Sequence, residues 1–235
     1  MIKMLSCGGK INMFKLGKLT FDVENATFGG SFMDSAMSRR MQSTGKEEFH
    51  WFIEIDMKAG DFVTELDEEE LKDLEDDEEI FYESVSPRLY HNNGFIVNIK
   101  SWKDIEGLSL KWDSQYNANG EEAGTLYVFE HEDVTSGTIK FLKRNANKFL
   151  VQWTGNANVY WNDEYGEDVP FSFEGEVEFS GVSAYCDEIS TLDELKIVMT
   201  DFINLDEYKC IFNDTHKIET GISRVWRFFP QNIDK

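Results

Sequence analysis

Apolar and polar residues alternate along most of this chain, and that alternation limits its fold more than any other feature. In the run 49–56 every second residue is apolar, beginning at Phe49. The same period of two recurs in five other runs: 19–24, 95–100, 138–142, 149–153 and 175–182. A strand with this pattern has one buried face and one solvated face. The sequence therefore predicts antiparallel sheets rather than a helical protein.

Turn-forming residues separate these runs at intervals of roughly 8–14 residues. Examples are Asn92-Asn93-Gly94, Asn119-Gly120 and Ser136-Gly137, and the pair Gly29-Gly30 also has the composition of a short turn. Short strands joined by turns are typical of a β-sandwich. We therefore expect residues 1–235 to form a mainly β, antiparallel sandwich, either as a single large domain or as two lobes that meet near 117–124.

Two stretches depart from the period of two. Thr191 is followed three residues later by Glu194, which is the pattern of a capping box, and the apolar residues behind it recur at helical spacing. This pattern predicts a short helix over about 191–203. A thinner apolar stripe after Thr64 favours a second short helix over about 65–76.

Acidic residues far outnumber basic ones. The chain has 45 Asp and Glu against 23 Lys and Arg, a net charge of −22 at pH 7. Phosphate recognition needs an excess of Lys and Arg, so this balance argues against nucleic acid and anionic membrane as partners. The run 65–79 holds 11 acidic residues and one basic residue, so a net −10 is concentrated in 15 positions.

Such a concentrated negative field attracts basic proteins and raises their association rate. We therefore predict that the acidic run contacts a basic protein partner. The predicted contact residues are Glu68, Glu69, Glu70, Asp73, Asp76, Asp77 and Glu78. The alternative is an acidic loop that only improves solubility.

Aromatic residues gather around a second acidic stretch near 153–165. Aromatic side chains edged by carboxylates can anchor a protein partner or stack on a sugar ring, although they can also simply fill a core. The predicted contact residues here are Trp153, Tyr160, Trp161, Asp163, Glu164 and Tyr165. Because Tyr160 and Trp161 are neighbours on one strand, their side chains leave opposite faces, and we expect one of them to be exposed or at an interface.

No catalytic set, metal site or cofactor motif is recognisable in the chain. The four histidines lack metal-binding spacing, and the three cysteines are too sparse for a disulfide framework or a zinc site. Cys186 is followed by two acids, Asp187 and Glu188, which would raise its pKa and make it less reactive. The apolar stretch before Cys7 is too short for a secretion signal, so we expect a cytoplasmic protein.

These observations lead to one functional hypothesis and two alternatives. The chain is expected to be a non-enzymatic, acidic, cytoplasmic binding protein that neutralises a basic protein such as a toxin domain, in the manner of an immunity protein. The first alternative is a carbohydrate-binding module or sugar-active protein, and the second is a structural subunit of a larger assembly. The sequence leaves the partner's identity and the oligomeric state open.

Overall fold

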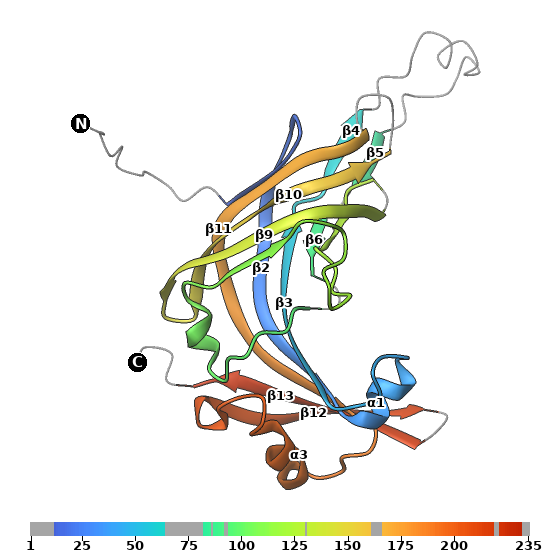
Figure 1. The fold of residues 1–235 in the computed structure, drawn as a ribbon, viewed down its shortest axis with the longest axis vertical. Helices are drawn as coiled ribbons and strands as arrows, with labels where there is room; N and C mark the ends of the chain where they lie inside the picture. Colours follow the sequence, from blue (N-terminus) through green and yellow to red (C-terminus); the bar gives the residue numbers. More distant parts are fainter. Residues whose placement is uncertain are drawn as a thin grey trace.

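Strands account for most of the chain in the computed structural model (Figure 1), which describes residues 12–63, 82–85, 87–91, 94–129, 131–160, 166–218 and 221–231. The strands are β1 (Met13–Leu16), β2 (Leu19–Met33), β3 (Glu48–Met57), β4 (Gly60–Val63), β5 (Tyr82–Val85), β6 (Arg88–Tyr90), β7 (Ser109–Trp112), β8 (Thr125–Tyr127), β9 (His131–Asn145), β10 (Lys148–Val159), β11 (Gly166–Cys186), β12 (Tyr208–Ile218) and β13 (Gly221–Pro230). The helical segments are α1 (Ser35–Arg40), η1 (Trp102–Ile105), α3 (Leu192–Met199) and η2 (Leu205–Glu207). The predicted mainly β fold is confirmed.

One large sheet contains eleven of the described strands and closes on itself. Its order is β1-β2-β3-β6-β8-β9-β10-β11-β13-β12, with β7 attached to β9, and β11 also pairs with β1 and β2. The β2–β11 pairing is parallel, whereas every other described strand pairing is antiparallel. The long strands β2 and β11 run side by side in Figure 1, with the β12–β13 hairpin at one end of the molecule and β4–β5 at the other. The core lies between facing walls of this one closed sheet.

Aromatic side chains fill the space between the facing walls. The ring centroid of Phe28 lies 5.3 Å from that of Trp51, 5.1 Å from that of Phe141 and 5.5 Å from that of Phe179. These four residues come from β2, β3, β9 and β11, and all are buried. Aromatic pairs at such separations each contribute about 0.5–1.5 kcal/mol beyond the burial of their surface. The core therefore ties together the strands that form opposite walls.

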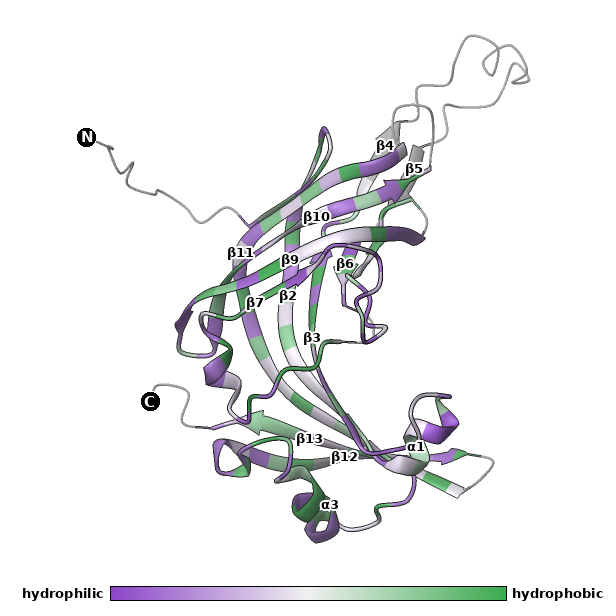
Figure 2. Ribbon diagram, viewed as in Figure 1, coloured by the Kyte–Doolittle hydropathy of each residue, from purple (hydrophilic) through white to green (hydrophobic). Residues whose placement is uncertain are grey.

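The alternation of apolar and polar residues in the sequence matches the alternation of buried and less buried side chains along the strands. In β3, Phe49, Trp51, Ile53 and Ile55 are all buried, as predicted, and the residues between them are less buried. Figure 2 shows hydrophilic and hydrophobic residues following one another along β10 and β11. These strands therefore have a core face and an outer face, and the polar residues between the core positions are available for a surface site.

The turn predicted at Gly29-Gly30 is wrong, because both glycines lie inside β2, where β2 pairs with β11. A Cβ atom on Gly29 would lie 2.7 Å from the Phe52 ring, and one on Gly30 would lie 2.7 Å from the Phe49 ring. Glycine within a strand often marks such a close approach. The two glycines therefore make room for neighbouring side chains at the parallel seam that closes the sheet.

The helix predicted over 191–203 is confirmed, although it is shorter. It begins at Leu192, after the N-cap residue Thr191, and ends at Met199. The capping box is present: the Glu194 N–H donates to the Thr191 hydroxyl (3.3 Å), and the Thr191 N–H donates to the Glu194 carboxylate (3.1 Å). Residues 200–202 form a turn instead of a further helical turn. The second predicted helix, over about 65–76, lies outside the described residues.

The predicted lobe boundary near 117–124 falls in the connection between β7 and β8. Buried residues from both sides of it, among them Phe28 and Phe179, belong to one core cluster. Whether the chain divides into lobes there stays a prediction. Within the described ranges, no helix combines the length and the apolar character needed to cross a membrane.

His91 is a buried ionisable residue, 1% exposed, that follows the end of β6. Its ring lies 4.9 Å from the Trp112 ring and 5.7 Å from the Phe95 ring, measured between centroids. Burial lowers the pKa of His91 from 6.5 to about 4, although backbone groups at Gly94 and Glu122 oppose this shift. The folded state therefore holds this imidazole in its neutral form down to about pH 4.

This burial predicts a specific loss of stability in mild acid. Between about pH 6.5 and pH 4 the unfolded state binds a proton at His91 and the folded state does not, so the free energy of unfolding should fall by up to about 3 kcal/mol as the pH falls. The measurement is urea unfolding across this range for the native chain and for His91→Gln, which should lack this part of the loss. The exposed residue His216 supplies the control His216→Gln, which should behave like the native chain. A parallel fall in the native chain and in His91→Gln would contradict the assignment.

Candidate functional site

A cleft of about 900 Å³ opens on the outer face of the sheet, over the five neighbouring strands β2, β3, β6, β8 and β9. We call it the tyrosine cleft. The side chains that give it its chemistry are Asn25, Asp56, Arg88, Tyr90, Tyr127 and His131. Their strand neighbours Ile55, Leu89 and Leu126 are fully buried. Because successive side chains of a strand point to opposite faces, the cleft residues project away from the core.

Strand register brings five of these residues into one row across the sheet. Asn25 pairs with Asp56, Asp56 with Arg88, Arg88 with Tyr127, and Tyr127 with His131. Residues directly opposite each other on neighbouring strands share a face and are close enough to interact. The closed sheet therefore assembles one polar row from residues that are far apart in the sequence.

A β-bulge in β2 adds Glu24 to the site. The register between β2 and β3 shifts between Val23 and Asn25, so Glu24 is an extra residue on the β2 side. A bulge re-aims side chains locally, and here both Glu24 and Asn25 are exposed and line the tyrosine cleft. The bulge thereby places a further carboxylate at the cleft.

Arg88 is held between two carboxylates. Its Nε atom lies 2.7 Å from Asp56 Oδ1, and its terminal Nη2 atom lies 3.0 Å from Glu54 Oε1. The hydrogen bond to Asp56 and the charge of that carboxylate raise the pKa of Arg88. One guanidinium therefore contacts two carboxylates, and Glu24 adds a third at the same cleft, so this part of the surface has an excess of negative charge.

Two tyrosines give the cleft its aromatic surface. The Tyr127 ring meets the His131 ring edge to face, with centroids 5.2 Å apart and an interplanar angle of 61°. Tyr90 is two residues after Arg88 on β6 and so lies on the same face. Tyr90 and Arg88 also line a neighbouring cleft of about 320 Å³. The two clefts therefore adjoin each other at Arg88 and Tyr90, and together they present both aromatic and charged side chains.

Two of the aromatic residues predicted to contact a partner, Trp153 and Tyr160, lie among the described residues. One is buried and the other is exposed. Trp153 is 0% exposed and its ring packs edge to face against Phe171, with centroids 6.3 Å apart, so the prediction that it contacts a partner is wrong. It shares the inward face of β10 with Phe149 and Val151. Tyr160 is 69% exposed just after β10, as expected for one of the pair 160–161.

Tyr160 lies close to two carboxylates, those of Glu167 and Asp133. The pKa of its hydroxyl is raised, first by removal of water and then by the charges of Glu167 and Asp133. Asp133 pairs with Thr125, which pairs with Tyr90, in the row next to that of Arg88. Tyr160 therefore lies near one end of a cross-strand row that continues into the tyrosine cleft.

The other predicted contact residues lie outside the described residues. They are Glu68, Glu69, Glu70, Asp73, Asp76, Asp77, Glu78, Trp161, Asp163, Glu164 and Tyr165. The strands that flank the acidic run are described: β4 and β5 pair with each other, and Ala59 and Pro87, just before β4 and just after β5, both line the tyrosine cleft. β4 therefore begins, and β5 ends, close to the edge of this cleft.

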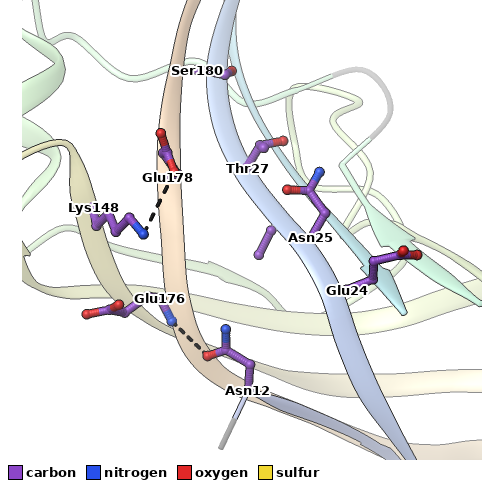
Figure 3. A pocket seen from close by; sticks show the side chains of 9 residues that line it. Asn12, Glu24, Asn25, Thr27, Lys148, Glu176, Glu178 and Ser180 are labelled. Atoms are coloured by element: carbon purple, nitrogen blue, oxygen red, sulfur yellow. Dashed lines mark hydrogen bonds and ion pairs between the residues drawn. The ribbon is translucent and has the colours of Figure 1, made fainter. Parts of the chain in front are cut away.

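A second, smaller cleft of about 430 Å³ lies on the other side of β2 (Figure 3). It forms because β11 pairs with β1 up to Glu174 and with β2 from Glu178 onward, which leaves a gap between β2 and β11. Asn12 lies in this gap, where its side-chain oxygen accepts the Glu176 N–H at 3.2 Å. The Lys148 Nζ atom lies 3.9 Å from Glu178 Oε2. Glu24 lines both clefts, so acidic side chains extend from β11 across β2 to β3.

The chemistry of these clefts suits binding. Among the described residues, no group of three or more His, Cys, Asp and Glu side chains is arranged to hold a metal ion. Burial, followed by the charges of Asp34 and Asp187, raises the pKa of the Cys186 thiol, which makes it a poor nucleophile. The cleft residues instead offer hydrogen bonds, ring faces and negative charge.

No protein-family model, curated protein or solved structure matches this chain. A function therefore has to be inferred from the geometry and the electrostatics of the clefts.

The contrast between Trp153 and Tyr160 can be tested directly. Trp153→Ala removes a fully buried indole and should lower the free energy of unfolding by about 3–5 kcal/mol. Tyr160→Ala alters an exposed side chain and should change it by less than about 0.5 kcal/mol. Urea unfolding of both variants and the native chain measures the difference. Equal losses in the two variants would contradict the assigned burial.

Proposed function

We propose that this chain is a non-enzymatic binding protein that holds a basic protein partner over the tyrosine cleft and neutralises it, as an immunity protein neutralises a toxin. The observation that carries the proposal is the position of β4 and β5, which flank the acidic run 65–79: β4 begins and β5 ends close to the edge of the cleft. The described strands before and after the strongly negative run therefore adjoin a cleft with exposed tyrosines and carboxylates.

The charge distribution supports fast capture of a cation. The run 65–79 carries −10 and the remaining 220 residues carry −12, so the negative field has a local maximum in that run. A local maximum orients an approaching basic protein and raises its association rate. The field extends about 10 Å at 0.1 M salt, so it guides the last part of the approach.

Aromatic side chains supply the short-range contacts. Protein interfaces derive most of their affinity from a few central residues, and tyrosine is one of the residues enriched among them. Tyr90, Tyr127 and Tyr160 meet this description, because each is at least partly exposed and lies on or near a row that also carries a carboxylate. Glu24 and Asp56 complement basic groups of the partner beside them.

The proposal includes a cytoplasmic location. Cys186 and Cys210 are free thiols, and free thiols are usual in a reducing compartment. A partner that is harmful inside the cell would have to be neutralised there, which fits a chain with a net charge of −22.

Neutralising the acidic run tests the proposal. In one variant the seven predicted contact acids of the run, Glu68, Glu69, Glu70, Asp73, Asp76, Asp77 and Glu78, are replaced by Gln or Asn. The matched control variant neutralises seven exposed acids elsewhere: Glu47, Asp104, Glu106, Asp113, Asp201, Asp206 and Asp214. Both variants lose the same total charge, so any difference between them reports the position of the charge.

Each form of the chain is used to capture proteins from the source cells, and a captured partner is then purified and its association rate is measured at low and high salt. We expect a partner with an excess of Lys and Arg, whose association rate with the native chain falls at least tenfold between low and high salt. The first variant should lose most of that salt dependence, and the control variant should keep it. An acidic partner, or association that does not respond to ionic strength, would refute the proposal.

Carbohydrate binding is the second candidate function. The observation that favours it is that Tyr90 and Tyr127 line the same cleft as Asn25 and Asp56, whose planar polar groups could share hydrogen bonds with sugar hydroxyls. A glycan array probed with the native chain and with Tyr127→Ala tests this candidate. Binding that is lost in Tyr127→Ala supports it, and an array without hits removes it. A structural role in a larger assembly stays a prediction from the sequence.

A further inference from the structure

We propose that the tyrosine cleft binds the side chain of an arginine that the basic partner supplies. The proposal rests on the proposed function, because it assigns the cleft a role within that interaction. It names the chemical group that is recognised, a guanidinium, and the residues that recognise it: Glu24, Asp56, Tyr90 and Tyr127.

The charge of the cleft favours a cation. The cleft is lined by the carboxylates of Glu24 and Asp56, and Arg88 offsets only one of them. Glu54, which Arg88 also contacts, lines the neighbouring cleft, so these four groups together carry a net −2. The Asp56 side chain is 23% exposed and that of Glu54 is 35% exposed, so both carboxylates are partly removed from water. Their attraction for a cation is therefore stronger than it would be for fully solvated groups.

The state of Arg88 disfavours an anion as the ligand. A phosphate or carboxylate ligand needs a guanidinium with free donors, but Arg88 already donates to Asp56 through Nε and lies against Glu54 through a terminal nitrogen. An incoming anion would also meet the Glu24 carboxylate at the same cleft. The contacts of Arg88 instead show that this surface accommodates a guanidinium.

The tyrosines favour arginine over lysine. A guanidinium is flat, stacks on an aromatic face and binds a carboxylate with two parallel hydrogen bonds, whereas an ammonium group is compact and strongly hydrated. Tyr127 is held edge to face against His131, so its ring is already oriented before a ligand arrives. A cleft of about 900 Å³ has room for a long side chain beside the ring.

The experiment compares three probes with the full chain by calorimetry at low salt: a tetra-arginine peptide, a tetra-lysine peptide of equal charge, and the neutral sugar maltotriose. The native chain should bind the arginine peptide about two- to fivefold more tightly than the lysine peptide, which corresponds to one exposed cation–π contact. Maltotriose should give no binding.

Three variants locate the preference. Tyr127→Leu should weaken only the arginine peptide, so that the two peptides bind equally. Glu24→Gln should weaken both peptides by a similar factor, because it removes charge and no ring, and as an exposed substitution it leaves the fold intact. Tyr116→Leu is the control, because Tyr116 is a 50% exposed tyrosine outside the cleft lining and its loss should change neither affinity.

Equal binding of the two peptides by the native chain would overturn the arginine proposal, and so would a preference that survives in Tyr127→Leu. Binding of maltotriose alone would overturn it in favour of a sugar. If the peptides bind equally but a basic partner still shows salt-dependent association, only the assignment of the cleft fails. If a captured partner is acidic or its association ignores salt, the proposed function itself fails.

Discussion

The parallel pairing of β2 with β11 is the constraint on which the rest of the structure depends. It joins the two ends of a long run of antiparallel strands and so converts an open sheet into a closed one. Closure gives Phe28 and its neighbours an enclosed space to fill. It also leaves polar side chains of β2, β3, β6, β8 and β9 facing outward, where adjacent strands combine them into rows. The core and the clefts are therefore two results of the same pairing.

The sequence alone predicts those structural features that depend on residues close together in the chain. The period of two in β3 and the capping box at Thr191 depend on neighbouring residues, and both predictions are confirmed. The inward position of Trp153 was also accessible, because it has the same parity in β10 as the buried residues Phe149 and Val151. The acidic residues that follow it in the sequence, Asp163 and Glu164, suggested a surface position instead.

The tyrosine cleft could not be found in the same way. Its row joins Asn25, Asp56, Arg88, Tyr127 and His131, and only strand register brings these residues together. The strands β6 and β8 have three residues each, which is too short for a recognisable period. The bulge at Glu24 has no signature in the sequence either. The acidic run, by contrast, is evident from composition, which explains why the sequence identified the charge of the proposed interface but not its cleft.

The seam between β2 and β11 has a consequence for the order in which the protein can form during its synthesis. β2 is complete at Met33, but β11 does not end until Cys186. At roughly 5–20 residues per second, a ribosome needs on the order of 10–30 s to make the residues between them. For that time the edge of β2 destined for β11 has no native partner and is open to strands of other nascent chains. The growing chain thus depends on the completion of β11 to end this exposure to aggregation.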